Sequence, residues 1–406
     1  MKLCFIGCGG QAFHVYADAL ARCGREGAGV SYAACCDIDL EKAELFRKRA
    51  GFERAYADYS EMMRIEKPGA VILATPFAHT RKIAADVLSH PCAIMLEKPL
   101  GRDLGECLSI ARAVAKAGVR SMAAFNRRFM PLVRFLAREL AEGGSPLQHI
   151  GYEMCRVDRR EDHFYTTAIH GIDLARHIAG ADFQSAAFAY GGAGGAAARG
   201  AASRAAAGGP GAGTAANTGV AVANAGADAG VASNAGVAAA DAGTAPNAGT
   251  GIAANANAGA AASTAGARAA GGAAALGVVN TQMQCVFANG VTAQLSFCPT
   301  AGIMIERLAA ITENRSYFVR LPIWEDSPDM PGCIEKYESG RLAYRKTGLE
   351  ISDGASMFES NGFYAELKEF FACANGGLGT AHGVETAVEA MRVMDCMRNM
   401  DAAYSA

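Results

Sequence analysis

The sequence has no run of basic residues, no long apolar segment and almost no excess of either charge. Its 406 residues carry 38 lysines and arginines against 40 aspartates and glutamates, a formal net charge of −2. A surface for nucleic acid needs clustered positive charge, so this composition argues against a nucleic-acid partner. No apolar stretch approaches the ~20 residues that a membrane-spanning helix requires, which argues against a membrane protein.

The thirteen cysteines lack the spacing of metal ligands, and several fall inside expected buried strands. This usage predicts no metal site and is typical of reduced thiols, so we expect a cytoplasmic protein. The first apolar strand begins at Lys2, and we therefore expect no signal peptide before it.

Residues 191–277 contain no aromatic side chain and consist almost wholly of Ala, Gly, Asn, Thr, Ser and Val. Such a segment cannot bury enough apolar surface to offset the entropy lost on ordering. We predict a disordered low-complexity insertion; a stack of Ala/Gly repeats is the alternative. The chain is long enough for two further domains, expected at residues 1–122 and at 123–190 with 278–406.

The N-terminal run KLCFI at residues 2–6 predicts a buried parallel strand. The next six residues, GCGGQA, match the pattern G-x-G-x-x-G/A, in which glycines permit a tight turn and close approach of a pyrophosphate. A helix expected over residues 11–23 would present its N-terminal N–H groups to the phosphates. The pattern predicts a dinucleotide site that contains Gly7, Gly9, Gly10, Gln11 and Ala12.

The next expected strand, residues 31–36, ends at Asp37. A carboxylate there can accept hydrogen bonds from both adenosine ribose hydroxyls and would repel a 2′-phosphate, so NAD is favoured over NADP. The alternative is that Asp37 or Asp39 caps the helix that begins near Leu40, a role that suits Asp39 better.

Strands and helices then alternate as far as residue 124, which predicts a doubly wound parallel sheet. Strands are expected at 55–57, 70–74, 93–96 and 120–124, and helices at 41–50, 60–65, 79–88 and 103–117. Ligands bind such sheets at the carboxyl ends of the strands. The residues expected to face the cofactor there are Thr75, Pro76, His79, Glu97, Lys98 and Asn126.

The motifs GCGGQA, ATPFAHT, EKPL and FNRRFMP, followed by AIHGID, resemble those of the Gfo/Idh/MocA oxidoreductases. The resemblance covers residues 1–190 in order and 278–400 more loosely, and its EKP motif is specific. It implies an N-terminal Rossmann domain and a C-terminal α/β domain with a large, mostly antiparallel sheet. One face of that sheet would roof the active site, and the other would form a homo-oligomer interface.

By this resemblance, Lys98 bonds the reacting hydroxyl and His170 is the general base, with Asp173 as the later acid of the H-x-x-D motif. An ammonium suits a developing alkoxide, and a histidine can accept and return a proton near neutrality. A surface lysine before Pro99 and a structural His170 are the alternatives. The spacing of His170, Asp173 and His177 places them on one helix face, but no further ligand supports a metal there.

Thr166 stands where relatives such as inositol dehydrogenase carry an aspartate, four residues before the histidine. A threonine can share a hydrogen bond but cannot support an imidazolium by charge. Arg156 and Tyr165 flank the motif and Arg128 lies in FNRRFMP. With Thr166 they are the expected substrate-facing residues, ordinary strand and loop positions being the alternative for the three that flank the motif.

The second domain is expected to contain strands and two late helices. The strands are predicted at 183–190, 278–287, 291–297, 306–312, 316–321 and 341–346, and the helices at 362–374 and 382–400. Asn289-Gly290 indicates a hairpin, and His382 fits a cap or surface position.

We expect an NAD-dependent dehydrogenase that acts on a secondary hydroxyl of a small sugar, cyclitol or polyol. A redox-neutral glycosidase of the same superfamily, which oxidises its substrate transiently, is one alternative. A non-catalytic NAD-binding or assembly protein is the other, favoured by Thr166 and the insertion.

Overall fold

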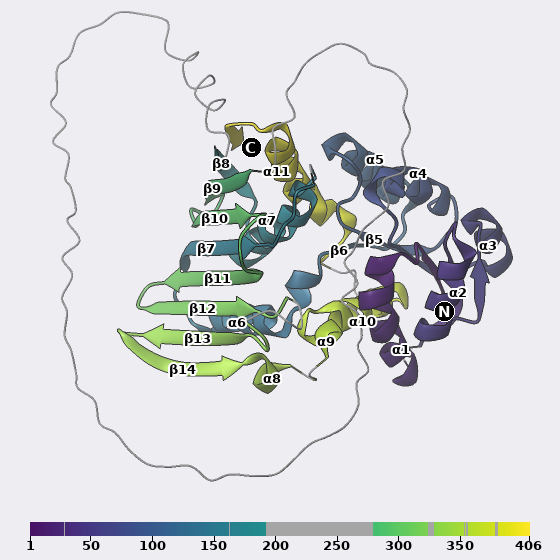
Figure 1. The fold of residues 1–406 in the computed structure, drawn as a ribbon, viewed down its shortest axis with the longest axis horizontal. Helices are drawn as coiled ribbons and strands as arrows, with labels where there is room; N and C mark the ends of the chain where they lie inside the picture. Colours follow the sequence, from purple (N-terminus) through teal and green to yellow (C-terminus); the bar gives the residue numbers. More distant parts are fainter. Residues whose placement is uncertain are drawn as a thin grey trace, which may run out of the picture. The chain divides into compact units, whose positions relative to one another are not determined.

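The computed structural model describes residues 1–27, 29–161, 163–191, 279–323, 329–352, 354, 356–377 and 381–406 (Figure 1). The predicted insertion at 191–277 lies outside these ranges except for Gly191, which ends a strand. All of the described residues belong to one unit.

Six parallel strands form the first sheet, in the order β3-β2-β1-β4-β5-β6. The strands are β1 (Lys2–Ile6), β2 (Ser31–Cys36), β3 (Arg54–Tyr56), β4 (Ala70–Leu73), β5 (Ala93–Glu97) and β6 (Ser121–Ala124). Their apolar runs are buried on both faces because helices cover both sides of a parallel sheet. Strand order reverses between β1 and β4, where such sheets bind their ligands. The predicted doubly wound sheet is confirmed.

Helices alternate with these strands. They are η1 (Ala12–Tyr16), α1 (Ala17–Arg25), α2 (Leu40–Ala50), α3 (Tyr59–Glu66), α4 (Phe77–Val87) and α5 (Leu104–Ala117). Asp39 caps α2, because its carboxylate accepts hydrogen bonds from the backbone N–H groups of Glu41 and Lys42. The expected single helix over 11–23 is corrected: it opens as the π-helical turn η1 and ends at Arg25.

The second sheet has nine strands in the order β14-β13-β12-β11-β7-β10-β9-β8-β15, and Figure 1 shows β8 to β14 as a ladder. Its strands are β7 (Leu147–Cys155), β8 (Phe183–Gly191), β9 (Asn280–Phe287), β10 (Thr292–Cys298), β11 (Ile305–Thr312), β12 (Arg315–Leu321), β13 (Cys333–Glu338), β14 (Arg341–Thr347) and β15 (Ala403–Ser405). Only β7 and β10 pair in parallel, so the expected mostly antiparallel sheet is confirmed. The predicted hairpin joins β9 to β10, with Gly290 at φ +85°.

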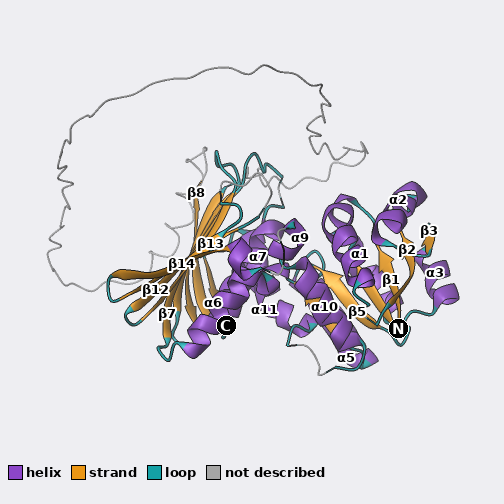
Figure 2. Ribbon diagram, turned by 90° about the horizontal axis from the view of Figure 1, so that it is seen from below, coloured by secondary structure: helices purple, strands orange, loops and turns teal. Residues whose placement is uncertain are grey.

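The remaining helices follow β6 in the chain. They are η2 (Asn126–Phe129), α6 (Pro131–Glu142), α7 (Tyr165–Ala179), α8 (Gly348–Ile351), α9 (Met357–Ser360), α10 (Phe363–Ala374), η3 (Val384–Ala387) and α11 (Val388–Asn399). Figure 2 shows α6 and α7 on one face of the nine-stranded sheet. Helix α10 instead packs against α1, and its Leu367 and Phe370 share the core of Phe5 and Tyr16.

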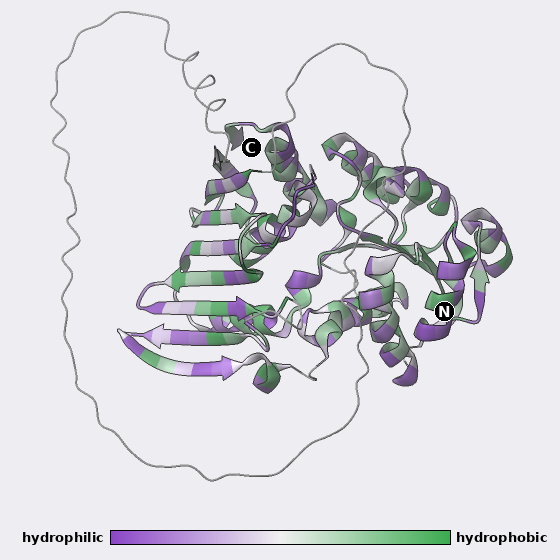
Figure 3. Cartoon of the chain, viewed as in Figure 1, coloured by the Kyte–Doolittle hydropathy of each residue, from purple (hydrophilic) through white to green (hydrophobic). Residues whose placement is uncertain are grey.

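Burial alternates along the strands of the second sheet, as in β9, and polar and apolar residues follow one another in Figure 3. One set packs under α6 and α7, while the other set is exposed and includes Val286 and Phe318. The expected oligomer interface on that outer face stays a prediction.

Candidate active site

The loop after β1 lies tightly against the neighbouring strand ends. The Gly7 N–H donates to Cys36 O at 2.8 Å, and Gly7 has φ +98°. A Cβ there would lie 2.5 Å from Ala74 O, so only glycine fits. A Cβ on Gly9 or Gly10 would meet no atom within 4 Å. The loop therefore has an open side at the point where a pyrophosphate is expected.

Asp37 fastens this loop to the end of β2. Its Oδ2 accepts a hydrogen bond from the Cys8 N–H at 2.8 Å, and its Oδ1 accepts one from the Asp39 N–H at 3.0 Å. A carboxylate has about four lone-pair sites, so two remain for a ligand. The side chain is half-buried at the sheet edge. Asp37 therefore holds the glycine loop, whereas Asp39 caps α2, the role for which the sequence favoured it.

Lys98 follows β5 and reaches the first turn of α7. Its Nζ donates to the backbone oxygen of Thr166 at 3.4 Å. Burial lowers the pKa of Lys98 to about 8; the neighbouring carboxylate of Glu97 opposes this shift, and Arg127, Arg159 and Arg156 add to it. At neutral pH the ammonium is therefore the main form, and the pKa of Lys98 lies only a little above that pH.

His170 lies one turn further along α7 and is buried, with 8% of its surface exposed. Its Nδ1 has no hydrogen-bond partner among the described residues. Burial, followed by the charges of Arg127, Lys98 and Arg156, lowers the pKa of His170 well below its usual value. The imidazole is thus neutral at pH 7, the form in which it can act as a base. Lys98 and His170 were predicted together, and the fold brings them to the same helix.

Asp173 and Arg128 were predicted as catalytic and substrate-facing residues, and the structure pairs them with each other. Arg128 Nε donates to Asp173 Oδ2 at 2.8 Å, and its Nη2 bonds the other carboxylate oxygen. Both side chains are almost wholly buried. Arg128 Nη1 also donates to Thr386 Oγ1 at 3.0 Å and to His382 Nδ1 at 3.3 Å. His382 is thus a half-buried partner of Arg128 rather than a surface residue.

Arg156 also has an internal partner. Arg156 and Arg127 share the carboxylate of Glu306 on β11, and Arg127 Nε lies 2.7 Å from Glu306 Oε2. Burial alone would raise the pKa of Glu306, but the two guanidinium groups offset it and hold the value at about 2. Sequence reasoning missed Arg127 and Glu306; the available signal was a lone acid in the apolar strand IERLAAIT.

Glu97 belongs to a second buried cluster that the sequence did not suggest. Tyr16 OH donates to Glu97 Oε1 at 2.6 Å and to Glu366 Oε2 at 3.4 Å. Glu366 lies on α10 and is fully buried, and its Oε1 has no partner in the described part of the chain. Burial and the adjacent Glu97 raise the pKa of Glu366 well above its usual value, which favours the protonated form of Glu366.

The other predicted site residues have few specific side-chain contacts in the described part of the chain. Pro76 and His79 are exposed at the start of α4, and Thr75 is half-buried. Asn126 is buried, and its Nδ2 donates to Asn361 O at 2.9 Å. Tyr165 is half-buried at the start of α7, where burial raises its pKa. Their cofactor and substrate roles stay predictions.

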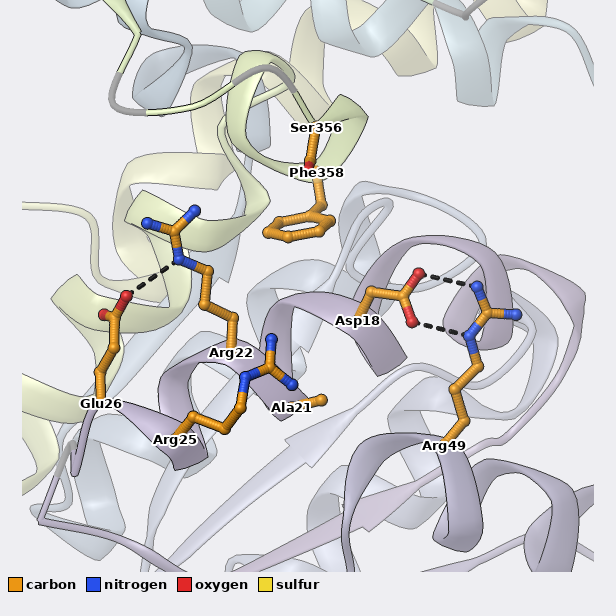
Figure 4. Close-up of a pocket in the computed structure, with 8 residues that line it drawn as sticks. All are labelled: Asp18, Ala21, Arg22, Arg25, Glu26, Arg49, Ser356 and Phe358. Atoms are coloured by element: carbon orange, nitrogen blue, oxygen red, sulfur yellow. Dashed lines mark hydrogen bonds and ion pairs between the residues drawn. The ribbon is translucent and has the colours of Figure 1, made fainter.

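A surface pocket of about 540 Å³ on α1 and α9 contains none of the predicted site residues (Figure 4). Its Arg49 makes two 2.7 Å bonds to Asp18, and its Arg22 Nε lies 2.9 Å from Glu26 Oε1. Two of the three arginines that line this pocket are thus already paired with acids.

Two kinds of feature are absent from the described residues. They contain no group of three or more His, Cys, Asp or Glu side chains arranged to hold a metal ion. No helix among them is long and apolar enough to cross a membrane.

A Rossmann-type sheet with a glycine loop, joined to a mostly antiparallel sheet, defines a class of dinucleotide-binding α/β folds. Residues 1–125 match the family model GFO_IDH_MocA, described as "Oxidoreductase family, NAD-binding Rossmann fold". Residues 1–125 are thus similar to the NAD-binding domain of the Gfo/Idh/MocA oxidoreductases.

Curated relatives include D-apiose dehydrogenase of Paraburkholderia graminis, 28% identical over 29% of this chain and 32% of that protein. The scyllo-inositol 2-dehydrogenase (NAD+) of Bacillus subtilis is 28% identical over 36% and 45%. Inositol 2-dehydrogenase 4 of Saccharopolyspora erythraea is 30% identical over 40% and 50%. The chain spans at most half the length of these three relatives.

Solved structures resemble nearly the whole chain at low identity. A dehydrogenase from Clostridium difficile aligns over 98% of this chain and 99% of its own, with TM-score 0.67 and 13% identity. A putative myo-inositol dehydrogenase from Sinorhizobium meliloti covers 100% and 99%, with TM-score 0.64 and 14% identity. These likenesses show the two-sheet fold.

Proposed function

We propose that the protein is an NAD-dependent dehydrogenase of a secondary hydroxyl in a sugar, cyclitol or related polyol. The observation that supports the proposal is that Lys98, which follows β5, contacts the first turn of α7, the helix that carries His170. Lys98 Nζ contacts the Thr166 carbonyl, one helical turn before a buried histidine with an unpartnered Nδ1. The relatives named above are dehydrogenases of apiose and inositols, which are polyhydroxylated compounds of this kind.

The residues around the carboxyl ends of β1 and β2 suit a dinucleotide. The open side of Gly9 and Gly10 would admit the pyrophosphate, and the two remaining acceptor sites of Asp37 would bind the adenosine ribose. A 2′-phosphate would meet the Asp37 carboxylate, so we favour NAD over NADP. When bound, the nicotinamide supplies the hydride acceptor.

The chain's own groups handle the charge and the proton. The Lys98 ammonium would donate a hydrogen bond to the substrate hydroxyl and stabilise the alkoxide that develops there. His170, neutral at pH 7, would accept the hydroxyl proton. Asp173 is engaged by Arg128 and would hold this side of α7 in place rather than exchange protons. The Thr166 carbonyl would keep Lys98 directed at the first turn of α7.

The test is NADH formation by the full chain against a panel of sugars, inositols, sugar acids and alditols. Lys98→Ala is expected to lower turnover by about 10²–10³-fold, the usual cost of losing one such donor, while NAD affinity stays within about twofold. Lys116→Ala is the matched control, because Lys116 is an exposed lysine of α5 with no such contact. Unchanged turnover in Lys98→Ala would exclude this mechanism. Tightly retained nucleotide without net NADH would favour the redox-neutral glycosidase.

A further inference from the structure

The buried groups behind the proposed site carry more positive than negative charge. Arg127 and Arg156 both bond Glu306, so one carboxylate serves two guanidinium groups. The side chains of the three residues are at most 8% exposed. A net buried charge is costly unless a partner of opposite charge is supplied. The triad therefore leaves one positive charge without a counter-charge of its own.

Two further cations flank the first turn of α7. Lys98 Nζ contacts Thr166 O at 3.4 Å, and Arg159 Nη2 donates to Thr167 Oγ1 at 3.2 Å. Arg159 pairs with Glu161, and its side chain is 41% exposed. No carboxylate of the described residues lies within ion-pair distance of Lys98 Nζ. Lys98 is thus a second cation without an ion pair, because Glu97 acts on it only from beyond ion-pair distance and accepts a hydrogen bond from Tyr16.

His170 lies beside both sets of cations and lacks an acidic partner. The charges that act on it, from Arg127, Lys98 and Arg156, are all positive. Asp173, the nearest acid along α7, is bonded to Arg128, and Thr166 is uncharged. The Nδ1 of this buried ring has no hydrogen-bond partner among the residues that the structure describes.

We infer that the substrate carries an anionic group, a carboxylate or a phosphate ester, near the hydroxyl that is oxidised. That group would supply the negative charge that Lys98 and the Arg127–Glu306–Arg156 triad lack. Arg159, whose side chain is 41% exposed, would attract the anionic group from solvent. The inference rests on the proposed function, and it narrows the polyol class to acidic members.

The test is calorimetric titration of the full chain, loaded with NAD, with pairs of probes that differ in charge. D-Gluconate is compared with D-glucitol, D-galacturonate with D-galactose, and D-glucose 6-phosphate with D-glucose. We expect at least one acidic probe to bind about 10-fold or more tightly than its neutral mate. The carboxylate and phosphate arms show which anion the site accepts.

Arg159→Gln is expected to weaken binding of the preferred acid about 10-fold and to leave the neutral probe unchanged. Arg160→Gln is the matched control, because Arg160 is the next residue, is 76% exposed and pairs with Asp158. Neutral probes that bind as tightly as every acid, or an acid affinity equal in Arg159→Gln and wild type, would overturn the inference.

The two proposals fail in different ways. Lysine-dependent NADH formation from neutral polyols alone would keep the dehydrogenase and overturn the anionic substrate. Tight binding of an acid without NADH from any probe would support the anionic site and count against the dehydrogenase.

Discussion

Replacement of Glu306 by glutamine should cost a large and pH-dependent part of the stability. Glu306 is fully buried on β11 and bonded to Arg127 and Arg156. In Glu306→Gln both guanidinium groups stay buried without a counter-charge. Breaking a buried pair in this way typically costs about 3–5 kcal/mol.

The magnitude also follows from the pKa of Glu306. The two arginines hold it at about 2, against an ordinary value of 4.5. The lowered pKa corresponds to a stabilisation of about 3 kcal/mol. Because the folded-state pKa is depressed, the contribution is complete well above pH 4.5 and is lost as the pH falls toward 2. At pH 3 only about 1 kcal/mol of this stabilisation should remain.

Urea unfolding of wild type and Glu306→Gln between pH 3 and pH 7 measures this dependence. The difference between the two proteins should shrink by about 2 kcal/mol over that range. Glu313→Gln is the control, because Glu313 is exposed just after β11. A wild-type–variant difference that stays constant with pH would refute the assignment of the low pKa to Glu306.

Three further predictions concern the site. Turnover in the oxidative direction should fall tenfold per pH unit above about pH 8, where Lys98 loses its proton. Lys98→Arg should move this fall in turnover to higher pH. If the fall occurs at the same pH in Lys98→Arg, it belongs to the titration of another group. Asp37→Ser should raise the NADP-to-NAD ratio of kcat/KM about 10-fold or more, whereas Asp39→Ser should cost about 1 kcal/mol of stability through the lost cap and leave the ratio unchanged. Glu366→Gln should gain stability relative to wild type as the pH rises above 4.5, since a buried acid with a raised pKa destabilises the fold there. Urea unfolding of both proteins at pH 5 and pH 8 measures this gain, and a difference between variant and wild type that is the same at both pH values would contradict it.

The parallel sheet could be read from the sequence because its signals are local. Each strand is a short apolar run, and caps such as Asp39 and Asp103 mark where helices begin. The second sheet was read less completely. Strands β7, β13 and β15 were missed. Polar residues dominate β13, CIEKYE at 333–338, and β15 has only three residues. Strand β7 has the regular alternation of a half-buried strand, so its pattern was available in the sequence.

The position of Lys98 and His170 was predictable, but their environment was not. The motifs place one residue at a strand end and the other on a helix, and topology brings them together. Glu306 and Glu366 lie more than 130 residues further along the chain and contact the site only through tertiary packing. The apolar neighbours of Glu306 in its strand indicate that it is buried, but nothing in the local sequence identifies Arg127 and Arg156 as its partners.

The absence of an acid at Thr166 gains meaning from these buried contacts. A neutral residue beside His170 removes the support that an aspartate would give to an imidazolium. Asp173 does not replace it, because both of its oxygens bond Arg128. The ring instead faces the charges of Arg127, Arg156 and Lys98, which oppose protonation. A proton can be accepted there more readily once a negative charge has entered the site. An anionic substrate would therefore raise the basicity of His170 as it binds, and the charge missing at residue 166 would be supplied by the molecule that is oxidised.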